Sequence, residues 1–136
     1  MTASARFDLP VIEQESKPFW EAARDDRLLI GHCNNCDRFH YYPRPFCPHC
    51  WAEDVDLVEA SGRATLYTYS IVFMNDLAPF NDRLPYVAAM VDLEEGVRLS
   101  SNIVGCSAEA LRIGMPLSVT FEEITADISK PVFRPA

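Results

Sequence analysis

The sequence predicts a mainly β protein in which an N-terminal helix and a rubredoxin-like zinc ribbon precede a five-stranded OB-fold barrel. Two Cys-x-x-Cys motifs, Cys33-Asn-Asn-Cys36 and Cys47-Pro-His-Cys50, lie ten residues apart, a spacing that can bring four thiolates to the corners of one tetrahedron. After Ser61-Gly62 the chain becomes rich in β-branched and aromatic residues. One hairpin, a long loop and a short helical turn before the last long strand then match an OB-fold.

The composition is that of a soluble globular chain. Of the 136 residues, 49% are hydrophobic and 24% are charged, which suits one ordinary domain or a small domain with a metal-stabilised appendage. No apolar run approaches the roughly 20 residues of a membrane helix. Residues 1–8 lack the apolar run of a signal peptide. We therefore expect a cytoplasmic protein without a membrane partner.

The negative charge disfavours a nucleic-acid partner. The net charge is −8, and both halves share it, with eleven acids and six bases in residues 1–60 and nine acids and six bases in residues 61–136. Proteins that bind phosphate backbones normally present a basic stripe, because displaced counterions supply their affinity. This sequence has no such stripe.

The first regular element is a helix over about residues 17–26. Ser16 is expected to cap it, and Pro18 falls in its first turn, where proline is favoured. Phe19 and Trp20 are adjacent in the chain, so they should not both face one core. Either one ring covers the ribbon and the other the barrel, or a second surface is needed to bury the pair.

The next segment predicts the ribbon. Residues 28–30 should form a strand leading into the first motif, and residues 38–46 a second strand that Pro43 and Pro45 turn toward the second motif. Three histidines lie close to the cysteines, but a closed site with four thiolates leaves no position for a histidine ligand. We expect these three to be ordinary ribbon residues: His32, His40 and His49.

The candidate metal ligands are Cys33, Cys36, Cys47 and Cys50, and the expected metal is Zn²⁺ in a closed structural site. Iron is the less favoured alternative, because tetrahedral thiolates suit both metals. Two disulfides would need an oxidising compartment, which nothing in the chain suggests. A metal is also the expected stabiliser of residues 28–58, since so short a segment buries little core by itself.

The remaining residues predict the barrel. A half-exposed acidic strand over residues 53–60 should precede it, and Leu66 and Tyr69 should lie on opposite faces of the first long strand. The expected barrel elements are that long strand ending at Phe73, a loop over 74–84, a hairpin of 85–93 and 97–104 around Gly96, a helical turn at 108–111, a strand over 117–122 and a last short strand within 128–136. We expect three regions: an arm and helix (1–27), the ribbon (28–58) and the OB-fold domain (59–136).

Several short motifs then occur in a characteristic order. They are Pro18-Phe-Trp20, Tyr42-Pro-Arg-Pro45, Cys47-Pro-His-Cys50, Ser61-Gly-Arg63, Pro85-Tyr-Val87 and Arg112-Ile-Gly-Met-Pro116. Together they resemble the acyl-CoA-associated zinc-ribbon OB-fold family, long catalogued as a domain of unknown function. The resemblance covers roughly residues 10–136. One departure is Asp37, which stands where the family often has glycine after the first motif.

The resemblance implies a small, non-catalytic accessory subunit. Such a subunit docks on a thiolase-fold enzyme, either an acetyltransferase or a lipid-transfer-like aldolase, and sometimes on a hydratase. It forms a hetero-oligomer with that enzyme and helps to form its acyl-CoA channel. The family supplies no catalytic residue to carry over, and only the four cysteines transfer as metal ligands.

The residues themselves agree with an accessory role. Cys106, a possible nucleophile, has no histidine close to it in sequence, so we expect no catalysis by the chain alone.

Aromatic side chains are typical interface anchors, and the candidate interface residues are Phe19, Trp20, Tyr41, Tyr42 and Phe46. Arginine suits the phosphates of CoA, and the candidate contacts are Arg38, Arg44, Arg83 and Arg112. The alternatives are a nucleic-acid-binding protein and a rubredoxin-like electron carrier.

Overall fold

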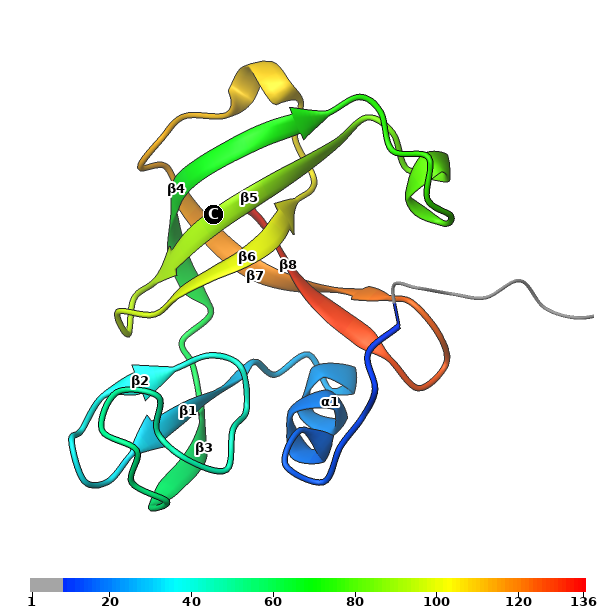
Figure 1. Ribbon diagram of the computed structural model, residues 1–136. Coiled ribbons are helices and arrows are strands. Elements are labelled where there is room, and N and C mark those ends of the chain that lie inside the picture. The colour runs from blue at the N-terminus through cyan, green and yellow to red at the C-terminus, as the bar shows by residue number, and fades with distance from the viewer. Residues whose placement is uncertain (1–8) are drawn as a thin grey trace, which may run out of the picture.

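The computed structural model describes residues 9–136 and contains one helix, a three-stranded sheet and a closed five-stranded barrel (Figure 1). The predicted fold class is confirmed. The part of the expected N-terminal arm at residues 1–8 lies outside the described residues. In the described part of the chain, no helix is long and apolar enough to cross a membrane.

The ribbon sheet has the strand order β2-β1-β3, and both pairings are antiparallel. Its strands are β1 (Leu29–Cys33), β2 (Phe39–His40) and β3 (Val55–Glu59). The expected second strand over residues 38–46 is much shorter than predicted. Proline cannot donate to a strand ladder, so the segment containing Pro43 and Pro45 continues as a loop.

The barrel closes in the order β4-β5-β6-β8-β7, and β4 pairs with β7 to complete the circle. Its elements are β4 (Arg63–Val72), the 3₁₀ turn η1 (Phe80–Asp82), β5 (Tyr86–Leu93), β6 (Arg98–Ile103), the 3₁₀ turn η2 (Ala108–Ala110), β7 (Pro116–Glu123) and β8 (Ser129–Pro135). The hairpin of β5 and β6 turns at Gly96, which has a φ of 91°. Glycine adopts this conformation without steric cost. Strands β6 and β8 run parallel and share one registered pair. This is the Greek-key arrangement of an OB-fold.

Helix α1 (Lys17–Arg24) joins the two parts of the molecule. It contacts β1 of the ribbon and β7 and β8 of the barrel, and Figure 1 shows it beside the ribbon and below the barrel. Phe19 and Trp20 are both buried in one core cluster that also contains barrel side chains such as Phe133. The prediction that these adjacent rings should not both face one core is therefore wrong, because the helix has apolar neighbours on more than one side.

Two further local predictions are wrong. Ser16 does not cap the helix with its side chain: its Oγ donates to the carbonyl oxygen of Glu13 (3.3 Å) and accepts from the Glu13 amide (3.0 Å). Leu66 and Tyr69 do not lie on opposite faces, because both pack against the core. A shift in register between Leu66 and Thr68 marks a β-bulge, and the extra residue, Tyr67, reverses the alternation.

Candidate metal centre and barrel pocket

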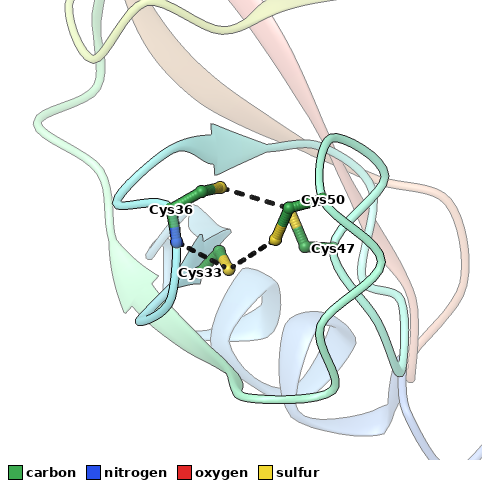
Figure 2. Close-up of side chains that lie close together, drawn as sticks. All are labelled: Cys33, Cys36, Cys47 and Cys50. Atoms are coloured by element: carbon green, nitrogen blue, oxygen red, sulfur yellow. Dashed lines mark hydrogen bonds between the residues drawn. The ribbon is translucent and has the colours of Figure 1, made fainter.

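Four cysteine sulfurs meet at one end of the ribbon (Figure 2). Cys33 ends β1, Cys36 follows in the next turn, and Cys47 and Cys50 lie on the loop before β3. All four sulfurs lie within 4.8 Å of one another, with 3.6 Å between Cys33 and Cys50 and 3.7 Å between Cys36 and Cys47. With Zn–S bonds of about 2.3 Å, sulfurs of a tetrahedral site are about 3.8 Å apart. The donor set therefore fits a single zinc ion.

Backbone and side-chain N–H groups point at these sulfurs. The amide of Cys36 donates to Cys33 Sγ (3.4 Å), and the amide of His49 donates to Cys47 Sγ (3.3 Å). The side-chain amide of Asn35 donates to Cys50 Sγ (3.5 Å). Such donors favour the charged form of a sulfur, which is the form that binds a metal.

The pKa values of two of these thiols move in opposite directions, one through hydrogen-bond donors and the other through burial. The Asn35 side chain, followed by the backbone N–H of Ala52, lowers the pKa of Cys50 to about 6. Burial raises the pKa of Cys36 to about 12. Several thiolates held this close repel one another, so a bound cation is the natural way to keep all four charged.

Each motif is closed by a residue in the left-handed backbone region. Asp37 has a φ of 62° and its amide donates to the carbonyl oxygen of Cys33 (2.9 Å). Trp51 has a φ of 69° and its amide donates to the carbonyl oxygen of Cys47 (2.9 Å). Glycine adopts this conformation without steric cost and aspartate tolerates it. This explains why Asp37 can stand at a position where glycine is common.

Among the described residues, the four cysteines are the one group of metal-binding type, and no histidine belongs to it. His32 Nε2 lies 2.7 Å from Asp37 Oδ1, and His49 Nε2 lies 3.3 Å from the carbonyl oxygen of Phe39. His40 is buried, and its ring lies so close to Gly31 that a Cβ there would clash with it. All three histidines thus lie in the ribbon outside the metal-binding group, and Nδ1 of the buried His40 has no hydrogen-bond partner among the described residues.

Four of the five candidate interface rings form one internal cluster: Phe19, Trp20, Tyr41 and Tyr42. Phe19 is fully buried, and Trp20 Nε1 donates to the Tyr42 hydroxyl (2.7 Å). In this structure the cluster joins the helix to the ribbon, and the Phe19 side chain has no solvent-exposed surface. Phe46 lies apart from the cluster and stacks on Trp51, an exposed ring that the sequence analysis did not select. Its position directly after the second cysteine motif was the available signal.

The four candidate arginines do not converge. Arg38 and Arg44 are exposed on the ribbon. Arg112 is exposed, and its Nη1 donates to the carbonyl oxygens of Glu109 and Leu111 in its own loop. Arg83 lines a pocket at the end of the barrel.

This barrel pocket has a volume of about 500 Å³, within the usual range for a small-molecule site. Its walls include Ile71, Phe80 and Val87, together with Arg83, Lys130 and Cys106. The Arg83 guanidinium lies 5.8 Å from the centroid of the Phe80 ring. The sequence did not predict Lys130, because the prediction depended on the fit of arginine side chains to phosphate. Strands β5 and β6 and the β4–β5 loop, which line the pocket, correspond to the surface that OB-folds use for ligands.

A rubredoxin-like ribbon with four clustered cysteines, followed by a closed OB-fold barrel, defines a class of two-domain zinc-ribbon proteins. Models of two ChsH2 domains match the chain: the rubredoxin-like zinc ribbon domain over residues 20–56 and the C-terminal OB-fold domain over residues 57–122. The chain belongs to this ChsH2 family, also called DUF35, and the resemblance predicted from its motifs is confirmed.

Two of the similar proteins are named as subunits of enzymes that act on CoA thioesters. The chain is 39% identical over 127 residues to a probable enoyl-CoA hydratase alpha subunit of Thermomonospora curvata, covering 93% of this chain and 39% of that longer protein. It is 36% identical to a DUF35 domain-containing scaffold protein of Methanocaldococcus jannaschii, covering 79% and 77% of the two chains. A solved chain described as an Ltp2-ChsH2(DUF35) aldolase superposes with a TM-score of 0.81 and 38% identity, covering 93% of this chain and 98% of that chain. A further relative is named as a benzoylsuccinyl-CoA thiolase subunit of Thauera aromatica, at 31% identity over 62% of this chain and 59% of that one.

Proposed function

We propose that this chain is a non-catalytic accessory subunit that docks on a thiolase-fold enzyme and helps to form its acyl-CoA channel. The observation that carries the proposal is the likeness to a chain of an Ltp2-ChsH2(DUF35) aldolase over 98% of that chain's length. Relatives named as hydratase and thiolase subunits support the same role.

The barrel pocket is the proposed contribution to the channel. Its apolar walls suit the uncharged part of a thioester, and Arg83 and Lys130 suit the phosphates of CoA. Of the four arginines predicted from the sequence, the proposal uses Arg83 alone. The other three lie away from this pocket and stay predictions.

Zn²⁺ bound by the four cysteines is the proposed cofactor. The metal would hold together the end of a small sheet that has little core of its own. It takes no part in acyl chemistry, because four protein ligands leave no open position for a substrate. The expected role is structural.

Co-expression with a thiolase-fold enzyme from the same genome tests the proposal. We expect a stable hetero-oligomer on size-exclusion chromatography, with acyl-CoA turnover by the complex and none by this chain alone. Turnover by the isolated chain would overturn the accessory role. An enzyme with the same stability and kinetics in the absence of this chain would overturn it as well.

A further inference from the structure

The barrel pocket differs in charge from three other grooves in the described part of the chain. Two cationic side chains and one anionic side chain line it: Arg83, Lys130 and Glu122. Two grooves beside residues 43–45 are lined by more acidic than basic side chains, and a groove beside helix α1 is lined by equal numbers. In a chain with a net charge of −8, the barrel pocket is therefore the one of these four cavities that favours an anionic ligand.

Lys130 is held in the wall of this pocket by groups from neighbouring strands. Its Nζ donates to Asn102 Oδ1 on β6 (3.3 Å) and lies 3.9 Å from Glu122 Oε1 on β7. Asn102 Nδ2 in turn donates to the carbonyl oxygen of Val87 on β5 (2.9 Å), which turns Oδ1 toward the ammonium group. The Lys130 side chain is 23% exposed. The ammonium group is thus positioned before any ligand binds, which lowers the entropy cost of binding.

The size of the pocket admits one end of an acyl-CoA molecule. A round cavity of this volume is about 10 Å across. The pantetheine arm separates the phosphates of CoA from the thioester and spans roughly 15 Å when extended, at the bond lengths of a peptide-like chain. An extended ligand therefore cannot place its phosphates and its acyl group in this pocket at the same time.

The lining residues favour the phosphate end. An uncharged acyl chain makes no use of Arg83 and Lys130, and it would separate these cations and the polar groups beside them from water. A phosphate group accepts charge-assisted hydrogen bonds from both cations. Val87 and Ile103 also line the pocket, and they offer an apolar wall to the dimethyl group that lies next to the phosphate in pantetheine.

We propose that the barrel pocket binds the phosphate end of CoA, with Lys130 and Arg83 as the phosphate ligands, and that this chain recognises CoA itself and not the acyl group. This inference rests on the proposed function and names the part of the ligand that the chain binds. Asn102 and Glu122 are positioning residues, because they act through Lys130. The acyl group extends beyond the pocket, so its identity has no effect on this site.

Isothermal titration calorimetry of the purified, zinc-loaded chain tests the proposal with a series of ligands. CoA and hexanoyl-CoA share the phosphate end, so their Kd values should agree within about twofold. Hexanoyl-N-acetylcysteamine keeps the thioester and lacks the phosphates, and it should bind at least about tenfold more weakly. 4′-Phosphopantetheine should retain binding, whereas ADP, which has phosphates and no pantetheine arm, should bind more weakly than CoA.

Substitutions test the role of Lys130 directly. Lys130→Met removes the charge and should raise the Kd for CoA about tenfold, and Lys130→Arg should restore most of the affinity. Glu122→Gln keeps an acceptor for the ammonium group but removes a negative charge beside the phosphate, so it should lower the Kd. A purely structural residue would not improve binding when it is replaced.

Lys17→Met is the matched control, because the Lys17 side chain is 69% exposed on α1 and does not line the pocket. It should leave the Kd for CoA unchanged. Circular dichroism and zinc content check that each variant is folded.

The outcomes separate this site from the proposed function. Hexanoyl-N-acetylcysteamine that binds as tightly as hexanoyl-CoA would overturn the proposal, because the pocket would then hold the acyl group. ADP that binds as tightly as CoA would overturn the role of the apolar wall. An isolated chain that binds no CoA, or a Lys130→Met chain with an unchanged Kd, would overturn the phosphate site. The accessory role is decided separately, by the formation of the hetero-oligomer.

Discussion

Replacing Phe19 by alanine should destabilise the chain strongly. The ring is fully buried and makes edge-on contacts with Trp20, Tyr41 and Tyr42, at centroid distances of 4.9, 5.8 and 5.3 Å. Phenylalanine-to-alanine changes in cores cost about 3–5 kcal/mol. Because the two tyrosines are only partly buried and can move toward the cavity, we expect about 3–4 kcal/mol of unfolding free energy to be lost. That is a large share of the roughly 5–15 kcal/mol that stabilises a typical domain.

Urea unfolding of the zinc-loaded chain, followed by circular dichroism, measures this loss. The matched control is Phe73→Ala, because Phe73 is 73% exposed and should change the unfolding free energy by no more than about 0.5 kcal/mol. A Phe19→Ala chain that unfolds within about 1 kcal/mol of the unaltered chain would refute the internal aromatic cluster. If Phe19→Ala weakened binding to the partner enzyme but left the unfolding free energy unchanged, the result would support the original prediction that Phe19 lies at the partner interface.

Four further predictions concern the metal centre, the aromatic cluster and the barrel pocket. Cys36→Ser removes one of the four sulfurs, so zinc measured by mass spectrometry should fall well below one ion per chain; full zinc content would contradict the four-sulfur site. Asn35→Ala removes the side-chain donor to Cys50 Sγ and should weaken zinc binding about tenfold, as measured by competition with a chelator. Asn34→Ala should leave zinc binding unchanged. Burial raises the pKa of Tyr41 above its usual value of 10. As the pH rises, the unfolded chain therefore loses the Tyr41 proton before the folded chain does, and the unfolding free energy should fall above pH 10. Tyr41→Phe removes this proton and should make the unfolding free energy depend less on pH in that range. Arg83→Gln should raise the KM of the complex for acyl-CoA about tenfold, with partial recovery in Arg83→Lys, and an unchanged KM would remove Arg83 from the channel.

Local patterns in the sequence were sufficient for most of the fold. The spacing of the cysteines predicted the ribbon, and the Glu94-Glu95-Gly96 turn predicted the β5–β6 hairpin that the structure contains. The order of strands, loop and helical turn predicted the barrel. These features depend on residues a few positions apart, so a single sequence contains the information they need.

The local predictions that were wrong fail for a related reason. The alternation of faces along β4 breaks at Tyr67, because one extra residue in a β-bulge reverses every later side chain. Ser16 has the right residue type and position for a cap, yet its hydroxyl group pairs with Glu13. In both cases two acceptable local geometries compete, and packing with the rest of the chain selects one.

The sequence by itself determined the four sulfurs, the two architectures and their order along the chain. Only the tertiary structure decided that Phe19 lies inside, that Trp51 lies outside, and that Arg83 and Lys130 border one pocket. Helix α1 contacts both the ribbon and the barrel, so the exposure of its rings depends on elements more than a hundred residues away. A residue's type constrains what it can contact, but the closure of the barrel against the helix determines what it does contact.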